Sequence, residues 1–209
     1  MNSSALLSAE DRVLTASVWK WRVVDIVMAS IIAVACAVLF IVWNFAYEVP
    51  SGLLKPLLPG LQGLLVGPWL IAGVLAGLIV RKPGAALFAE MVAASISALA
   101  GNQWQALTLV SGLVQGVGAE LIFLIVLYRV YKLPIAVLAG AAAGLGAGIL
   151  DRFLWYGALD NAFAVTYITS TTISGALIAG LGSWFIMKGL AKAGALSRFA
   201  AGREVSQRV

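Results

Sequence analysis

The sequence contains no histidine and only one cysteine, Cys36, among its 209 residues. Histidine is the commonest general base and a frequent metal ligand, so its absence leaves carboxylates and one thiol for such chemistry. A Ser-His hydrolytic dyad is excluded for the same reason. A lone cysteine within an apolar run cannot form an internal disulfide, so cysteine usage gives no information on the redox compartment.

Charged residues are also scarce. They make up 11% of the chain, against 62% hydrophobic residues and a mean hydropathy of +1.00. A soluble domain of this size could not cover its core with polar surface, so most side chains must face lipid or one another. The apolar runs are rich in Gly and Ala and lack the alternation of a membrane barrel. The composition therefore predicts an all-α integral membrane protein with one helical bundle.

Six apolar runs are long enough to cross a membrane as helices. They cover residues of about 23–43, 61–80, 83–99, 106–128, 134–154 and 163–187. We expect a membrane domain over 23–187, preceded by a tail at 1–22 and followed by a basic tail at 188–209. The stretch 44–60 holds three prolines, which predicts an irregular loop, either a re-entrant segment or a lid.

Lysine and arginine are divided unequally between the segments that connect these helices. Both tails and the loops after the second and fourth helices together carry twelve of the 14 cationic residues. These are Arg12, Lys20, Arg22, Arg81, Lys82, Arg129, Lys132, Lys188, Lys192, Arg198, Arg203 and Arg208. The opposite segments carry only Lys55 and Arg152. Because cytoplasmic loops are enriched in Lys and Arg, both termini are predicted to be cytoplasmic.

The net charge of +5 is a feature of the helix ends. There, cations set orientation and meet anionic headgroups of the bilayer. The sequence has no basic run interleaved with stacking aromatics. We therefore expect contact with lipid and no nucleic-acid partner.

Glu90, Gln115, Glu120 and Asp151 fall inside the predicted helices. Ionisable groups there are costly, usually face the bundle interior and mark a site. The helical rise places both glutamates near the midplane and Asp151 near the outer end of its helix. In the functional interpretation, the glutamates form the floor of a cavity open to the outside, and Gln115 and Asp151 stand in its wall. In the structural interpretation, the glutamates are protonated or bonded within the bundle, and Asp151 pairs with Arg152 or an interfacial group.

Aromatic residues gather near the predicted outer face. Trp69, Trp104, Trp155 and Tyr156 either anchor the protein at the membrane interface or line the cavity together with Asn102. In a cavity, their rings would stack on a planar ligand, and the carboxylates would attract a cation or accept hydrogen bonds from an amino-heterocycle. The two interpretations remain open at this point. No metal site is predicted.

Short motifs at these positions carry a family resemblance. The segments R-K-P-G-A-A-L at 81–87 and V-Q-G-x-G-A-E at 114–120, with Gly101-Asn102, resemble the YkoE-type substrate-binding subunit of energy-coupling factor (ECF) transporters. This subunit is called the S component. The resemblance implies a prokaryotic cell-membrane protein that takes up thiamine or its hydroxymethylpyrimidine (HMP) precursor from outside. It also implies ligand roles at the matching positions, which are Glu90, Asn102, Gln115 and Glu120.

The resemblance also bears on the partners. Ala29 and Ala33 stand at four-residue spacing in the first helix, where small residues either pack within the bundle or form a groove for another protein's helix. In such families this motif docks on a transmembrane coupling protein, and two ATPase subunits supply the energy. The sequence has no G-x-x-x-x-G-K-[ST] motif, so any ATP would be used by partner subunits, and we expect no cofactor in this chain.

Two other classes of function are weighed against the transporter subunit. An intramembrane enzyme is disfavoured because the acids are dispersed on three helices, so we expect no enzymatic activity. A stand-alone ion-coupled carrier of a small cationic or heterocyclic solute is the alternative, with Glu90 and Glu120 as a proton relay.

Overall fold

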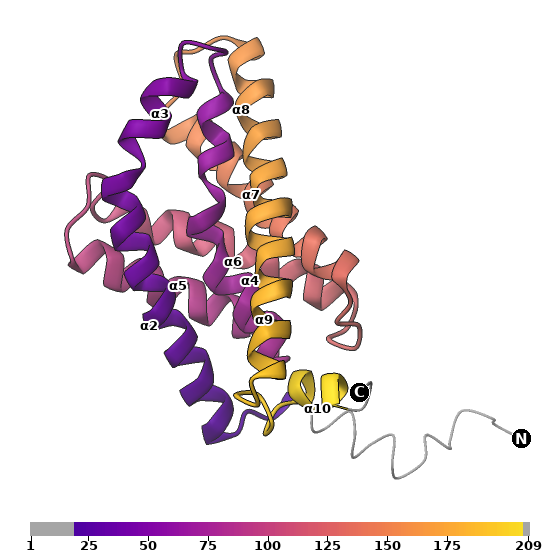
Figure 1. Cartoon of the computed structure of the whole chain (residues 1–209). Helices are drawn as coiled ribbons and strands as arrows, with labels where there is room; N and C mark the ends of the chain where they lie inside the picture. Colours follow the sequence, from indigo (N-terminus) through magenta and orange to yellow (C-terminus); the bar gives the residue numbers. More distant parts are fainter. Residues whose placement is uncertain (1–18, 207–209) are drawn as a thin grey trace, which may run out of the picture.

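The structure is a computed structural model that describes residues 19–206, with the backbone alone for 205 and 206. Most of the predicted N-terminal tail, up to residue 18, and residues 207–209 lie outside the described residues. All regular elements within 19–206 are helices (Figure 1). They are α2 (Val23–Ala46), α3 (Glu48–Leu54), η1 (Leu61–Leu65), η2 (Gly67–Leu70), α4 (Ile71–Val80), α5 (Ala85–Leu99), α6 (Leu107–Ile125), α7 (Leu133–Leu154), α8 (Asn161–Ser174), η3 (Gly175–Leu181), α9 (Gly182–Lys192) and α10 (Ala200–Ser206).

The length and hydropathy of these elements agree with the predicted membrane bundle. Four segments are long and apolar enough to cross a membrane: Val23–Ala46, Leu107–Ile125, Leu133–Leu154 and the continuous Asn161–Lys192. Gly67–Val80 and Ala85–Leu99 are shorter apolar helices. The described residues therefore contain four candidate spans, or six when both shorter helices are counted as the sequence prediction counts them.

Helix α4 lies at the centre of the bundle. Each residue from Ile71 to Val80 is buried, and the helix packs against α2, α5, α6 and α9. Its sequence is apolar on every side, which is typical of a helix with no polar surface to satisfy. Close approach depends on glycine, because a Cβ on Gly77 would overlap the ring of Phe123.

The predicted second helix, 61–80, is α-helical only from Ile71. Its first part consists of the 3₁₀ turns η1 and η2, because Pro68 lacks a backbone N–H and glycines weaken helix formation there. Other helices satisfy the backbone groups that are left: Gly67 N–H donates to Ser174 Oγ (2.9 Å), and Ser174 Oγ donates to the Leu64 carbonyl (2.6 Å). Irregular backbone at this depth requires such partners.

The predicted loop 44–60 contains more helix than expected. Helix α2 continues to Ala46, and α3 follows directly over Glu48–Leu54. Pro50 is the third residue of α3, in the first turn, where a missing N–H costs no hydrogen bond. Figure 1 shows α3 at the end of the molecule where α8 begins, at the top of the view.

The last predicted span is one helical column from Asn161 to Lys192 with a π-helical middle, η3. It starts two residues earlier than expected because Asp160 is its N-cap and accepts a hydrogen bond from Phe163 N–H (2.8 Å). The π segment packs on α7, where the backbones of Gly140 and Gly175 touch. Figure 1 shows the column running down to α10, at the opposite end from α3.

The alanine ridge of α2 faces the bundle interior. Ala29 and Ala33 have no exposed surface, and α2 packs on α4 and α5. The outward face of α2 carries larger side chains, among them Ile31, Val34 and Val38, each at least half exposed. In the structure the alanine ridge packs inside the bundle. A partner helix could therefore dock on these alanines only if α2 moved.

Candidate functional site

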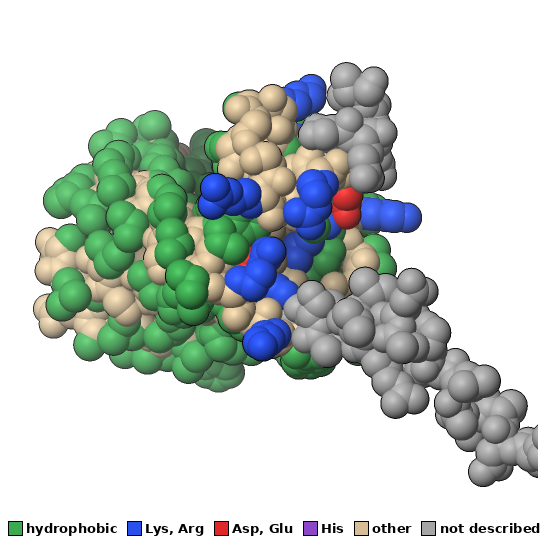
Figure 2. Space-filling view, turned by 90° about the horizontal axis from the view of Figure 1, so that it is seen from below, with side chains coloured by type: hydrophobic (Ala, Val, Ile, Leu, Met, Phe, Trp, Pro, Cys, Tyr) green, Lys and Arg blue, Asp and Glu red, His purple; other side chains and the backbone are tan. Residues whose placement is uncertain are grey.

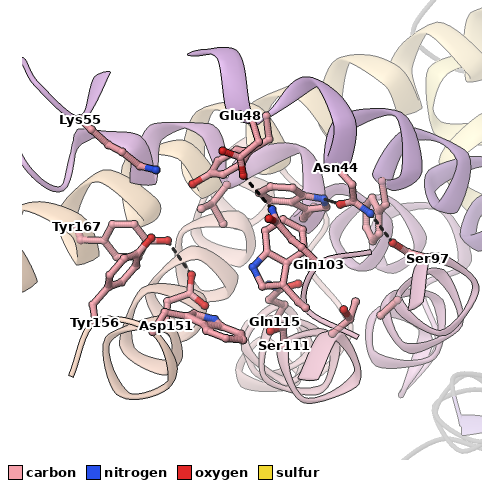
Figure 3. A pocket seen from close by; sticks show the side chains of 18 residues that line it. Asn44, Glu48, Lys55, Ser97, Gln103, Ser111, Gln115, Asp151, Tyr156 and Tyr167 are labelled. Atoms are coloured by element: carbon pink, nitrogen blue, oxygen red, sulfur yellow. Dashed lines mark hydrogen bonds between the residues drawn. The ribbon is translucent and has the colours of Figure 1, made fainter. Parts of the chain in front are cut away.

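A cavity of about 240 Å³ opens at the end of the molecule that carries α3 (Figure 3). Small-molecule pockets are roughly 300–1,000 Å³, so this one suits a small solute. Every helix from α2 to α8, except α4, contributes to it directly or through an adjoining turn. It is lined by Phe40, Asn44, Tyr47, Glu48, Lys55, Val66, Trp69, Ala94, Ser97, Gln103, Trp104, Thr108, Ser111, Gln115, Asp151, Trp155, Tyr156 and Tyr167.

One wall of the cavity consists of three aromatic rings. Trp69 lies with its ring centroid 5.0 Å from that of Tyr47 and 5.3 Å from that of Trp104. The Trp69 and Trp104 planes are nearly perpendicular, at 82°. Such edge-to-face packing fixes each ring by its neighbours and leaves ring faces available to a flat ligand.

Two asparagines hold this aromatic wall in place. Asn44 accepts from Trp69 Nε1 (2.8 Å) and donates to Ser97 Oγ (3.0 Å), so it ties the indole to α5. Asn102 does not line the cavity, but its Oδ1 accepts from Trp104 N–H (2.9 Å) and Thr108 Oγ1 (3.0 Å). The predicted site residue Asn102 therefore orders the loop that presents Trp104.

The opposite wall presents a carboxylate among phenol rings. Tyr167 donates its hydroxyl to Asp151 Oδ2 (2.8 Å), and the Tyr156 ring lies 4.9 Å from the Tyr167 ring. Tyr156 is outside the spanning helices, and burial raises the pKa of its phenol, which therefore stays protonated. The guanidinium of Arg152 donates to the carbonyls of Tyr156 and Leu159. Arg152 therefore binds the adjoining loop and not Asp151.

The mouth of the cavity carries charged and amide groups. Gln103 Nε2 donates to Glu48 Oε1 (3.1 Å), which links α3 to the loop before α6. Lys55 reaches in from the side of Tyr156 and Tyr167 (Figure 3). Burial raises the pKa of Tyr47, at the start of α3, to about 12, so its phenol also stays neutral.

Six of the predicted ligand residues meet at this cavity. They are Trp69, Trp104, Gln115, Asp151, Trp155 and Tyr156. The sequence interpretation missed Thr108 and Ser111, which line the cavity on the same face of α6 as the predicted Gln115, at spacings of three and four residues. That helical spacing is a signal that could have identified them. Asn44, Ser97 and Tyr167 gave no such signal, because each comes from a different helix.

Glu90 lies in the bundle core and does not line the cavity. Its side chain is 1% exposed, and its Oε2 accepts from Gly73 N–H of α4 (2.7 Å). Within residues 19–206, its Oε1 has no hydrogen-bond partner. Gly73 and Gly116 leave space for the Glu90 side chain. A Cβ on Gly73 would lie 3.2 Å from Glu90 Oε2, and a Cβ on Gly116 would lie 3.1 Å from Glu90 Cβ. Glu90 therefore connects α5 to α4 and α6.

Glu120 lies at the opposite end of the molecule from the cavity. Its carboxylate accepts from the backbone N–H groups of Gly84 (2.6 Å), Ala86 (2.9 Å) and Leu87 (3.3 Å), and from Tyr128 Oη (2.7 Å). It lies only five residues before the end of α6 at Ile125, roughly 8 Å from that end, rather than near the midplane. The sequence prediction placed it deeper because it extended this helix to residue 128. In the structure, Glu120 is the N-terminal cap of α5.

No group of three or more His, Cys, Asp or Glu side chains that could hold a metal ion occurs within residues 19–206. The arrangement offers instead flat aromatic faces, one carboxylate held by a tyrosine, and several amide and hydroxyl groups. Such a lining can bind a small heterocycle that carries amino groups or a positive charge.

The sequence and the fold are similar to those of known transport proteins. Residues 24–146 match the protein family described as "ABC-type cobalt transport system, permease component". The chain is 34% identical to a Bacillus subtilis (strain 168) protein described as "Putative HMP/thiamine permease protein YkoE", over 189 residues that are 90% of this chain and 94% of the relative. Its fold matches the "Crystal structure of an S-component of ECF transporter" with a TM-score of 0.83 and 34% identity, covering 90% of this chain and 95% of that chain.

Proposed function

We propose that this chain, which belongs to the S components of ECF transporters, captures HMP or thiamine in the cavity beneath α3. As an S component it is a transport subunit and not an enzyme, it is a multi-pass protein of the bacterial membrane, and it works with ECF partner subunits. Membership of this family replaces the alternative of a stand-alone ion-coupled carrier.

One observation carries the substrate proposal: the Asp151 carboxylate lies in the same cavity as the Tyr47, Trp69 and Trp104 rings. HMP is an aminopyrimidine, and thiamine joins that ring to a cationic thiazolium. Aromatic faces stack on either ring and favour positive charge. A carboxylate accepts hydrogen bonds from the amino group and attracts the thiazolium.

The hydrogen bonds of the cavity suggest how each group would act. Tyr167 occupies Oδ2 of Asp151, which leaves Oδ1 to accept from the ligand's amino group. Gln115 offers an amide that both donates and accepts hydrogen bonds. Its NH₂ group could donate to a pyrimidine ring nitrogen, and its oxygen could accept from the adjacent amino group. Trp155 and Tyr156 would close the ring stack from the side of α7.

The remaining predicted residues take supporting roles in this proposal. Asn102 positions Trp104, while Glu90 and Glu120 hold helices together at a distance from the ligand. We propose that the partner subunits are a transmembrane coupling protein and two ATPases, which would use the ATP. Docking at Ala29 and Ala33 stays a prediction; normal uptake by Ala33→Trp, with ligand binding intact, would contradict it.

Equilibrium binding to the detergent-purified protein tests the proposal. Three tryptophans line the cavity, so we expect thiamine and HMP to quench intrinsic fluorescence in a saturable manner. Asp151→Asn removes the charge but keeps the shape, and should weaken binding about tenfold or more, the usual value of a hydrogen bond to a charged group.

Glu204→Gln is the matched control, because Glu204 is an exposed acid at the opposite end of the molecule. It should bind both ligands as the wild-type protein does. Co²⁺ is added in parallel because cobalt stands in the description of the matched family. Quenching by neither organic ligand, in protein shown to be folded, would refute the substrate proposal while leaving the family assignment unaffected.

A further inference from the structure

The wall of the substrate cavity contains a buried hydroxyl, that of Ser97 on α5, whose hydrogen bonds all run in one direction. Ser97 lines the cavity, although only 1% of its surface is exposed. Its Oγ accepts from Asn44 Nδ2 (3.0 Å) and, over a longer distance, from Asn102 Nδ2 (3.4 Å). The Asn102 amide also donates to the Ser97 carbonyl (3.3 Å). Both bonds to Oγ therefore use its lone pairs and leave its hydrogen free.

The direction of these two bonds is fixed by what the asparagines bind on their other side. Asn44 Oδ1 accepts from the indole N–H of Trp69 (2.8 Å), a group that can only donate. Asn102 Oδ1 accepts from the backbone N–H of Trp104 (2.9 Å). Each asparagine must therefore turn its NH₂ group toward Ser97, and Ser97 must accept from both.

The hydroxyl hydrogen of Ser97 has no acceptor within residues 19–206. A serine in a helix commonly donates to the carbonyl one turn earlier, as Ser95 on the same helix does to Met91 (2.7 Å). Within the described part of the chain, Ser97 Oγ bonds to the two amides alone. Buried donors nearly always have an acceptor, so a free donor in a cavity wall indicates that a ligand supplies it. Toward that ligand, Ser97 can act only as a donor.

The helices place this donor across the cavity from the carboxylate of Asp151. Helix α6, which carries Gln115, packs against both α5 and α7. Figure 3 shows Ser97 and Asp151 on opposite sides of the cavity, with Gln115 between them. In the aminopyrimidine ring of HMP and thiamine, the amino group is bonded to C4, and N1 lies directly across the ring from C4. The ring therefore has a donor at one end and an acceptor at the other, the complement of Asp151 and Ser97.

We propose that Ser97 determines specificity by donating a hydrogen bond to N1 of the pyrimidine ring while Asp151 accepts from the amino group. This assignment rests on the proposed capture of HMP or thiamine and adds which edge of the ring Ser97 recognises. A ring that carries hydrogen at the position of N1 would leave the buried hydroxyl without an acceptor. Sites built to hydrogen-bond a substrate discriminate strongly against analogues that leave such a group unpaired.

A comparison of matched ligands on the detergent-purified full chain tests the proposal. HMP and thiamine are each paired with an analogue in which C–H replaces N1, and binding is followed by tryptophan fluorescence at a pH where the analogue ring is uncharged. The wild-type protein should bind each natural ligand about tenfold more tightly than its analogue. In Ser97→Ala this ratio should fall to about one, because no hydroxyl remains to favour the nitrogen.

The ratio distinguishes recognition of N1 from support of the cavity wall. Ser97→Ala also removes the acceptor of Asn44, but any loosening of the Trp69 ring affects a ligand and its analogue alike and cancels in the ratio. Ser95→Ala is the matched control, because it removes a hydroxyl from the same helix outside the cavity, and its ratio should stay about tenfold.

Two results would overturn the assignment of Ser97. One is equal affinity of the wild-type protein for a natural ligand and its analogue; the other is a ratio that stays about tenfold in Ser97→Ala. Absence of binding of both HMP and thiamine to the folded wild-type protein is a different result. It would refute the proposed function, and the role of Ser97 with it.

Discussion

Two acids inside apolar helices, Glu90 and Asp151, have different roles because of their neighbours. Asp151 is held by one tyrosine hydroxyl at the edge of a cavity, so part of its carboxylate can meet a ligand. Glu90 is enclosed by α4, α5 and α6 and accepts one backbone N–H. An acid within a membrane marks a site only where solvent or ligand can reach it.

Replacement of Glu90 by Gln tests this distinction. A Gln side chain has nearly the same shape and keeps an acceptor for Gly73 N–H, so the helix contact is preserved. We expect the dissociation constant for HMP or thiamine to stay within about twofold of wild type. Fluorescence titration measures it, with Asp151→Asn as the comparison. A loss as large as that of Asp151→Asn would return Glu90 to the binding site.

At the scale of elements, the start of α5 depends on a side chain from α6. Gly84, the N-cap residue of α5, has a positive φ of 84° and no side chain to cap the helix. Glu120 supplies the missing acceptor to three backbone N–H groups of this first turn. A carboxylate at a helix N-terminus is also favoured by the helix dipole.

Glu120→Gln should therefore act on stability. The amide keeps one acceptor oxygen but loses the charge and the second oxygen, so we expect unfolding to become easier by about 1–2 kcal/mol. Denaturant or thermal unfolding in detergent measures this change. Ligand affinity at temperatures where the variant is folded should match wild type; weaker binding with unchanged stability would contradict the capping role.

The crossing of α7 with η3 is a second element-scale feature. Gly140 and Gly175 bring the two backbones into contact, and a Cβ on either would overlap the other's carbonyl oxygen. The atoms that an added Cβ would meet belong to the backbone of the other helix, so no flexible side chain could move aside to make room for it. Small residues at such crossings are what allow membrane helices to pack closely.

Gly140→Ala should force these helices apart and destabilise the protein by at least 1–3 kcal/mol, as overpacked cores do. Gly182→Ala is the matched control, because that glycine is also helical and has no atom within 4 Å of an added Cβ. The control should be neutral or slightly stabilising. Thermal unfolding compares the two, and equal stability would show that the crossing tolerates a methyl group.

For the whole molecule, charge is concentrated at the end away from the substrate cavity. Figure 2 shows that end, where the loop after α4, the start of α7 and the residues after α9 meet. The cavity end carries Lys55 and Arg152. The positive-inside rule then predicts that the basic end is cytoplasmic and that the cavity faces outward, as capture of an external solute requires.

Thiol labelling of intact cells tests this orientation. Cys36 is buried and is replaced by Ala, and one cysteine is introduced at Ala158, beside the cavity, or at Ser197, at the basic end. Both positions are exposed. A membrane-impermeant maleimide should label position 158 in intact cells and position 197 only after lysis. The reverse pattern would contradict the predicted orientation.

Local sequence was sufficient for much of this protein. Hydropathy and run length predicted an all-α membrane bundle, because the absence of polar surface leaves lipid as the only solvent for such helices. The motifs at 81–87 and 114–120 led to the S-component family that the comparisons support. Trp69, Trp104, Gln115 and Asp151 were identified as candidate ligand residues and lie together at the cavity.

Contacts between distant segments decided the rest. The motif acids Glu90 and Glu120 were placed at the cavity floor, but one binds α4 and the other caps α5, since sequence spacing gives the face of a helix and not its neighbour. The irregular backbone of 61–70 depends on Ser174, more than 100 residues away. Sequence alone therefore predicted that this protein lies in a membrane and indicated the family to which it belongs. Only tertiary packing decided which polar groups reach a ligand and which are used to join the helices.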